Sequence, residues 1–339
     1  MNNIQKIDLL LQKAVTFVAF SYMNSNEVNT WIDISEKKLN KTFEVKSFDG
    51  KSSLNIIPSH TEWTTELESK LLLLDNIQVK IESTQSSTLK ENYLDNCNGF
   101  INSIKEGKFK KIILSRIKNV DFEVMKIGKL FNELNEKYPK ALVYLFHKEN
   151  EIWIGATPEI LAEFNQDRFK TISLAGTQKG NAIQWQDKEV EEQKIVTDYI
   201  LDTVAKNEVK NLEVKGPFTY KNGIVSHLKT EIKGKFNGDK SKFLSELHPT
   251  PAICGIPKEE AHQYILDSEN HNRKYYCGYL SFKEENKENY YVNLRCAELF
   301  SNSISLYLGG GITAQSEPEK EWDETELKAQ TLLSVIQNL

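Results

Sequence analysis

Two ionisable side chains in this 339-residue sequence stand where acid–base chemistry could use them. Lys111 opens the run Lys111-Ile-Ile-Leu-Ser-Arg116, whose apolar pattern predicts a strand that places a cation among buried residues. Burial lowers the pKa of an amine, and such a lysine can serve as a base at neutral pH. Glu159 ends the turn Gly155-Ala-Thr-Pro-Glu159, where a partly enclosed carboxyl can keep its proton and act as a general acid. An ordinary strand-end lysine and an ordinary turn carboxylate are the alternatives.

Two predicted helices carry acidic faces that suit a divalent cation. In the last helix, Glu321, Glu324 and Lys328 fall at i, i+3 and i+7 and therefore lie on one side. Glu189 and Glu192 do the same on an earlier helix. Carboxylates alone are the ligand chemistry of magnesium, which prefers oxygen. A solvated charged face explains either pattern equally well.

A third group of residues could hold an anion. The three glycines of Leu308-Gly-Gly-Gly-Ile312 allow close approach of a ligand, and their successive N–H groups could form an anion-binding nest. A glycine-rich hairpin turn is the alternative. Arg295, expected midway along a strand, could clamp a carboxylate, although most strand arginines face solvent. His227 and His248 lack metal-ligand spacing, and a structural role is the simpler interpretation.

The elements that must position these residues are mostly strands. Strands are predicted at Lys111–Val120, Ala141–Phe146, Glu151–Gly155, Ile160–Phe164, Phe169–Leu174, Val209–Val214, Ile224–Phe236, Tyr276–Phe282, Tyr290–Leu299 and Ser303–Leu308. Helices are predicted at Ile127–Leu134, Asp187–Val204, Lys258–Leu266 and Pro318–Leu339. Consecutive strands with few helices favour an α+β fold with largely antiparallel sheets. No linker is visible, so we expect one domain over residues 1–339, in which 1–100 are weakly patterned.

The composition excludes several classes of protein. Hydrophobic residues make up 39% and charged residues 27% of the chain, as in soluble globular proteins. The net charge of −5 gives no basic face for nucleic acid. The four cysteines show no C-x-x-C spacing and are interpreted as reduced thiols. No apolar run is long enough to span a membrane, and the first residues lack a signal-peptide pattern. We expect a soluble, cytoplasmic protein.

Eight ordered motifs make the sequence resemble the chorismate-utilising enzymes. The motifs are Lys111-Ile-Ile-Leu-Ser-Arg116, Ala156-Thr-Pro-Glu159, Leu174-Ala-Gly-Thr177, Glu192 in its helix, Leu247-His-Pro-Thr-Pro-Ala252, Asn293-Leu-Arg295, Gly309-Gly-Gly-Ile312 and Glu321-Trp-Asp-Glu-Thr325. The family includes isochorismate synthases, salicylate synthases, and component I of anthranilate and aminodeoxychorismate synthases. The resemblance covers residues 101–337, the motif-bearing catalytic region, and implies two facing, mostly antiparallel sheets with outer helices, as in anthranilate synthase component I. Residues 1–100 would form the variable N-terminal part of this framework.

The resemblance implies a role for each candidate residue. Lys111 would be the base that activates water for attack at C2 of chorismate, and Glu159 the acid that protonates the departing C4 hydroxyl. Glu192 and Glu324 would be ligands of Mg²⁺, and Glu321 would bind it through metal waters. The implied substrate-binding residues are His227, Ala252, Arg295, Gly309, Gly310, Gly311 and Lys328.

Two departures from the family pattern concern the site. Relatives usually carry Glu-His where this chain has Glu192 and Gln193, and the neighbouring Glu191 leaves the register of the ligand uncertain by one residue. Cys254-Gly-Ile-Pro257 replaces a version richer in glycine and threonine, which would alter the pocket wall.

The nucleophile distinguishes the reactions of the family. Ala175 stands where similar aminodeoxychorismate synthases place a lysine, which argues against amine transfer through a covalent lysine. Lys111 is the water-activating lysine that anthranilate synthases generally lack. We therefore expect an isochorismate synthase, an isomerase that is monomeric and needs no glutaminase subunit. Alternatives are a salicylate synthase, which also eliminates pyruvate, and a catalytically weak chorismate-binding protein. The sequence does not distinguish a menaquinone from a siderophore pathway.

Overall fold

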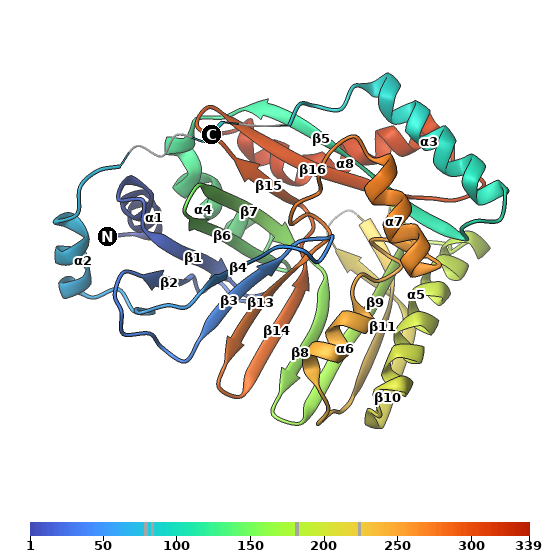
Figure 1. The fold of residues 1–339 in the computed structure, drawn as a ribbon, viewed down its shortest axis with the longest axis horizontal. Helices are drawn as coiled ribbons and strands as arrows, with labels where there is room; N and C mark the ends of the chain where they lie inside the picture. Colours follow the sequence, from blue (N-terminus) through green and yellow to red (C-terminus); the bar gives the residue numbers. More distant parts are fainter. Residues whose placement is uncertain (78–80, 83–84, 180–182, 223–224) are drawn as a thin grey trace.

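Two antiparallel sheets form the frame of the molecule (Figure 1). The computed structural model describes residues 1–77, 81–82, 85–179, 183–222 and 225–339. The order of the first sheet is β12 (Gly255–Ile256), β5 (Lys111–Asp121), β16 (Ser303–Ile312), β15 (Cys296–Leu299), β7 (Glu151–Thr157), β6 (Leu142–Lys148), β1 (Thr16–Ser21) and β2 (Asn29–Asp33). The order of the second sheet is β10 (Lys210–Asn222), β11 (Val225–Lys235), β9 (Arg168–Lys179), β8 (Ile160–Asn165), β14 (Lys287–Val292), β13 (Tyr279–Glu284), β3 (Thr42–Lys46) and β4 (Ser53–Ile56).

Strand alternation divides the apolar residues between two cores. In β1, Val18 and Phe20 join the core between the sheets, and Phe20 packs against Phe282 of the second sheet with ring centroids 4.2 Å apart. Phe17 and Ala19, on the opposite face of the same strand, join a second core beneath the helices. The first sheet is therefore buried on both faces, which explains why its strands are almost uniformly apolar.

Helices cover the outer faces of this frame. They are α1 (Asn3–Gln12), α2 (Thr65–Leu72), α3 (Lys90–Lys105), α4 (Ile127–Lys137) after the short 3₁₀ helix η1 (Val124–Lys126), α5 (Asp187–Lys206), α6 (Lys240–Leu247), α7 (Lys258–Ser268) and α8 (Pro318–Ile336). Apolar residues of α1, α4 and α8 pack on the first sheet, whereas α5 packs on β9 and β11 of the second (Figure 1). The predicted α+β class with facing antiparallel sheets is confirmed.

Most predicted elements are present, although several ends differ. The helices predicted from Asp187, Lys258 and Pro318 begin at those residues. The strand predicted at Val209–Val214 is the first half of β10, which continues to Asn222. The predicted strand start at Ile224 lies outside the described residues. The first hundred residues, for which we predicted no elements, supply β1 to β4 and so one edge of each sheet.

The chain passes from one sheet to the other at two points that matter for the site. β7 of the first sheet leads into β8 of the second around Glu159, and β14 of the second leads into β15 of the first around Arg295. The prediction of one strand over Tyr290–Leu299 was therefore wrong, because pairing stops after Val292 and resumes at Cys296. Arg295 has φ of +50°, which breaks the strand between the two sheets.

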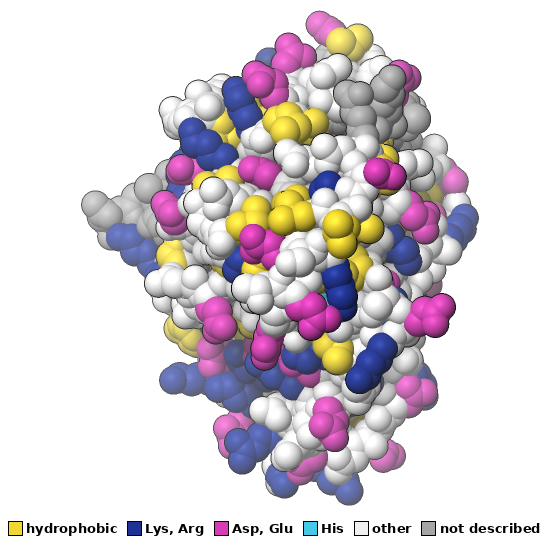
Figure 2. Space-filling view, turned by 90° about the vertical axis from the view of Figure 1, so that its left-hand side faces the viewer, with side chains coloured by type: hydrophobic (Ala, Val, Ile, Leu, Met, Phe, Trp, Pro, Cys, Tyr) yellow, Lys and Arg dark blue, Asp and Glu magenta, His cyan; other side chains and the backbone are white. Residues whose placement is uncertain are grey.

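Among the described residues, none of the helices combines the length and the apolar character needed to cross a bilayer. The left-hand side of the molecule in Figure 1, where α1 and α2 lie, faces the viewer in Figure 2. There acidic and basic side chains are interspersed, and apolar side chains appear in small patches.

Candidate active site

One cavity of about 240 Å³ brings together the residues that the sequence analysis assigned to the site. They come from strands of both sheets, from α5 and α8, and from the two passages between the sheets. The assigned residues that line this cavity are Lys111, Glu159, Glu192, His227, Ala252, Arg295, Gly309, Gly310, Gly311, Glu321, Glu324 and Lys328. Their common location is the first requirement for a shared chemical task.

Lys111 is the first residue of β5 and is 4% exposed, as predicted. It forms an ion pair with Glu192 of α5, which the sequence did not predict. Burial would raise the pKa of the Glu192 carboxyl, but the charge and the hydrogen bond of Lys111 lower it. In this ion pair the amine is a cation, so Lys111 must lose its proton before it can act as a base. Of the two neighbouring glutamates, Glu192 lines the cavity, whereas Glu191 is exposed and does not.

Glu159 lies where β7 gives way to β8 and is half-buried. Its backbone is fixed, since its carbonyl accepts a hydrogen bond from the Val292 N–H at 3.0 Å. Burial raises the pKa of its carboxyl from the ordinary 4.5 to about 7, although the charges of Lys111 and Arg295 oppose this shift. Glu159 therefore keeps its proton over a range in which an exposed glutamate is ionised, as a general acid requires.

The predicted face of α8 is turned toward the cavity. Glu321 is 7% exposed and its carboxylate accepts a hydrogen bond from Ser316 at 2.6 Å. Glu324 forms an ion pair with Lys328 at 2.6 Å. The Lys328 amine also donates to the carbonyl of Gly309 at 2.8 Å, which ties α8 to β16. This face of α8 therefore lines the cavity and is not a freely solvated helix face.

The acidic residues offer oxygen ligands of the type that magnesium prefers. Glu192 and Glu324 are close enough for the negative charge of Glu324 to raise the pKa of Glu192. An added methyl group on Gly310 would lie 3.5 Å from Glu321 and 3.8 Å from Glu324. Within the described part of the chain, however, no three acidic, histidine or cysteine side chains form a compact metal-binding group. Lys111 and Lys328 currently pair with two of the carboxylates.

Gly309–Gly311 do not form a nest, nor do they form a hairpin turn. They continue β16 in register with β5, so that Gly309 lies opposite Ser115 and Gly311 opposite Ile113. None of the three has a positive φ, whereas a nest requires one. The ladder between β15 and β16 runs only from Leu306 to Ile304 on the β16 side. After Leu306, β16 has no partner in β15, and there its backbone borders the cavity.

The remaining candidate residues are His227, Ala252 and His248. The His227 ring on β11 lies 3.2 Å from the Gly176 carbonyl, and burial lowers its pKa, so it is neutral at physiological pH. Ala252 follows α6 and is half-buried at the cavity wall. His248 is buried, and its ring nitrogen lies 2.9 Å from the Cys277 carbonyl. Burial lowers its pKa to about 3. His248 does not line this cavity, and its structural role stays a prediction.

Several lining residues were not singled out from the sequence. Tyr307 is an example, because it precedes Gly309 and Gly311 at the two-residue spacing of a strand face. Its hydroxyl lies 3.1 Å from Glu298 and also accepts a hydrogen bond from Gln85. Ile113 follows Lys111 at the same spacing. Strand periodicity could have identified both residues. The lining residue Leu294 lies within the motif Asn293-Leu-Arg295, whereas Tyr276 has no such signal.

Comparison with known proteins identifies the family of the chain. The sequence matches the profile of the chorismate binding enzymes over residues 4–337. It is 29% identical over 244 residues to the isochorismate synthase EntC of Escherichia coli K12, an alignment that covers 67% of this chain and 62% of that protein. It is 28% identical over 254 residues to the isochorismate synthase MenF of the same strain, over 69% of this chain and 58% of that protein. The chain thus spans about three fifths of these relatives.

Solved structures show the same fold. The putative 2,3-dihydroxybenzoate-specific isochorismate synthase DhbC from Bacillus anthracis superimposes with a TM-score of 0.78 at 24% identity, covering 98% of this chain and 99% of that one. The menaquinone-specific isochorismate synthase MenF from Escherichia coli superimposes with a TM-score of 0.83 at 19% identity, covering 99% and 92%. From the profile match over nearly its whole length and this shared fold, we conclude that the chain belongs to the family of chorismate binding enzymes.

Proposed function

We propose that this protein is an isochorismate synthase, which isomerises chorismate by adding water at C2 and expelling the hydroxyl group from C4. The observation that carries the proposal is the presence of Lys111 and Glu159 in one cavity. Glu159, with a pKa of about 7, can hold the proton that the leaving hydroxyl needs. Lys111, once it has lost its own proton and separated from Glu192, can accept the proton that the attacking water loses. One group that gives a proton and one that takes it are what this isomerisation requires.

The remaining residues would bind and orient the substrate. Chorismate is a dianion, and Arg295 and Lys328 bring positive charge to the cavity. The backbone along Gly309–Gly311 brings N–H donors close to the ligand, because no side chain intervenes. Fixing the ring between these groups would place C2 on the side of Lys111 and C4 on the side of Glu159.

Magnesium is part of this proposal. Glu192 and Glu324 would hold the ion directly, and Glu321 would hold it through water, since all three are hard oxygen donors on one cavity. Bound there, the ion would offset the negative charge of the substrate.

The test is to incubate the purified protein with chorismate and Mg²⁺ in the absence of ammonia, and to separate the products. Isochorismate is expected, and Lys111→Ala should abolish its formation while the exposed neighbour Lys110→Ala leaves it unchanged. Salicylate together with pyruvate would instead identify a salicylate synthase. Anthranilate or aminodeoxychorismate formed only with ammonia would show that water is not the nucleophile. No turnover under any of these conditions would overturn the proposal and favour a chorismate-binding protein.

A further inference from the structure

The strand that begins with Lys111 runs along an edge on which backbone pairing is short. β12 has two residues and pairs with β5 only at Lys111 and Ile112. The Ile113 N–H then donates to the Cys254 carbonyl at 2.7 Å. Within the described residues, no strand continues the ladder along this edge after Ile113.

Beyond this point the backbone of β5 is hydrogen-bonded to a buried ion pair, Glu269 and Arg273. The carboxylate of Glu269 accepts two hydrogen bonds from Ser115, one from its N–H at 2.6 Å and one from its hydroxyl at 2.9 Å. The guanidinium of Arg273 donates to the Ile113 carbonyl at 2.9 Å. It also donates to the Ile253 carbonyl at 3.2 Å. Side chains thus replace the missing strand and connect β5 to the segment that carries Ala252.

The two side chains of the pair are almost completely buried. Both side chains are 2% exposed, and Arg273 donates two hydrogen bonds of 2.7 and 2.6 Å to Glu269. Burial alone would raise the pKa of Glu269, but the charge and hydrogen bonds of Arg273 lower it, so the pair is ionised. Replacing such a buried pair by apolar residues of similar volume often leaves stability unchanged. Its geometric effect on β5 is therefore the more informative property.

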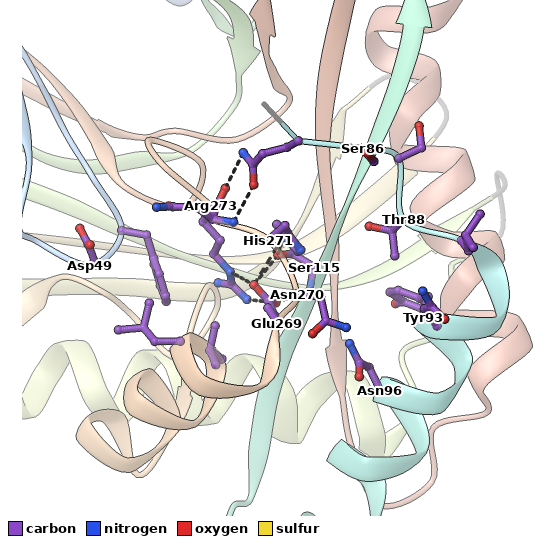
Figure 3. A pocket seen from close by; sticks show the side chains of 18 residues that line it. Asp49, Ser86, Thr88, Tyr93, Asn96, Ser115, Glu269, Asn270, His271 and Arg273 are labelled. Carbon is purple, nitrogen blue, oxygen red and sulfur yellow. Dashed lines mark hydrogen bonds and ion pairs between the residues drawn. The ribbon is translucent and has the colours of Figure 1, made fainter. Parts of the chain in front are cut away.

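The position of the pair connects it to the candidate active site. Ser115, Glu269 and Arg273 line a second cavity of about 670 Å³, which Figure 3 shows from close by. Their partners Ile113 and Ile253 line the candidate active site. The pair therefore stands at the back of the active-site wall, with its bonds to β5 two and four residues beyond Lys111.

We propose that Glu269 and Arg273 are positioning residues, which hold β5 and residues 252–253 in place so that the Lys111 amine keeps its location in the cavity. Neither side chain lines the candidate active site, so each acts through the backbone of Ile113, Ser115 and Ile253. The kinetic part of this proposal rests on the proposed function.

The test is a double variant, Glu269→Leu with Arg273→Met, which removes the pair without leaving an unpaired buried charge. We expect a folded protein in which kcat falls by about 10²-fold, as for a reacting group displaced by about 1 Å. The KM for chorismate should stay within about threefold, since Arg295 and Lys328 lie on segments that the pair does not contact. The amide of Ser115 should exchange its hydrogen faster, because its acceptor is lost. Arg273→Lys, which retains the charge, should recover part of kcat.

The matched control replaces another ion pair, Glu44→Leu with Lys283→Met, which joins β3 to β13 at 2.6 Å and does not line the candidate active site. Its kcat should equal that of the unmodified protein. Should the double variant prove unstable, Ser115→Ala removes the hydroxyl contacts to Glu269 and His271 but keeps the Ser115 N–H bond to Glu269, and it should give a smaller loss of kcat in the same direction.

Two results would overturn the proposal. Unchanged exchange of the Ser115 amide in the double variant would mean that the pair does not hold β5. Faster exchange with unchanged kcat would mean that holding β5 does not position Lys111. If the unmodified protein forms no isochorismate, the proposed function fails, and the exchange measurement still decides whether the pair holds the strand.

Discussion

Glu159 combines the two properties that set the pH dependence of the proposed reaction. Its carboxyl borders the cavity, and burial raises its pKa to about 7. Below this pH the side chain carries the proton that the leaving hydroxyl would receive. We expect kcat to fall as the pH rises through 7, and this decline to be absent from a pH profile of Glu159→Gln. The variant should retain about 1% of the activity or less, because a positioned general acid contributes roughly 10²- to 10⁴-fold.

The same pKa shift has a consequence for stability. An acid whose pKa is higher in the folded than in the unfolded chain binds more protons when folded, so stability falls as pH rises between about 4.5 and 7. Glu159→Gln removes this loss and should gain stability relative to the unmodified protein across that window. The control for the effect on turnover is the same change at Glu163 in β8, Glu163→Gln, which should leave kcat unchanged. If the difference in melting temperature between Glu159→Gln and the unmodified protein does not vary with pH, the pKa of the Glu159 carboxyl is not shifted.

At the scale of single residues, the sequence predicted which side chains lie close together, but it did not predict how they interact. Lys111, Glu159 and Arg295 were selected by type and motif, and they line one cavity. The ion pair between Lys111 and Glu192 could not be predicted, because the two residues lie on different elements whose contact depends on the tertiary fold. The register of Glu192 against Glu191 was open for the same reason, since a helix face is defined only once its neighbour is known.

At the scale of elements, the two passages between the sheets explain where the site lies. Glu159 and Arg295 are held at the points where a strand of one sheet has ended and a strand of the other has not begun. The sequence around Arg295 reads as one continuous strand, since Tyr290 to Leu299 are mostly apolar. Periodicity cannot reveal a change of sheet when both strands are buried. The positive φ of Arg295 follows from this change of direction and has no signal in the residue type.

The glycines of β16 make the position of Lys111 testable. A methyl group on Gly311 would lie 2.6 Å from Cε and 3.2 Å from Nζ of Lys111, so the amine would have to move. We expect Gly311→Ala to fold and to lower kcat by up to about 10²-fold, because a displacement of about 1 Å at a reacting group has that effect. Steady-state kinetics with chorismate, together with circular dichroism to verify folding, would measure this.

Gly310→Ala is the matched comparison on the same strand. Its methyl group would face α8 and lie no closer than 3.5 Å to any atom, which is an ordinary contact. It should leave kcat within about threefold and alter mainly KM, because Lys111 is not displaced. Equal losses of kcat in both variants would mean that the loss comes from a change in the backbone of β16 and not from displacement of Lys111.

At the scale of the whole molecule, the carboxylates of the proposed metal site come from the two halves of the fold. Glu192 lies on α5, which packs on the second sheet, and Glu324 lies on α8, which packs on the first. The two carboxylates repel each other; burial and the charge of Glu324 would raise the pKa of Glu192, but Lys111 and Lys328 offset them, so that this pKa is lowered overall. A cation held between the two helices would replace this repulsion by attraction and link the halves of the molecule.

Magnesium should therefore stabilise the folded chain even without substrate. A ligand that binds only the folded state at ten times its Kd contributes about 1.4 kcal/mol to the free energy of unfolding, and the melting temperature should rise accordingly on addition of Mg²⁺ and return with EDTA. Glu192→Gln and Glu324→Gln should each abolish this rise, whatever their own melting temperature. Glu319→Gln serves as the control, because Glu319 pairs with Lys90 near the start of α8 and does not line the cavity. An unaltered rise in both site variants would place any bound magnesium elsewhere on the molecule.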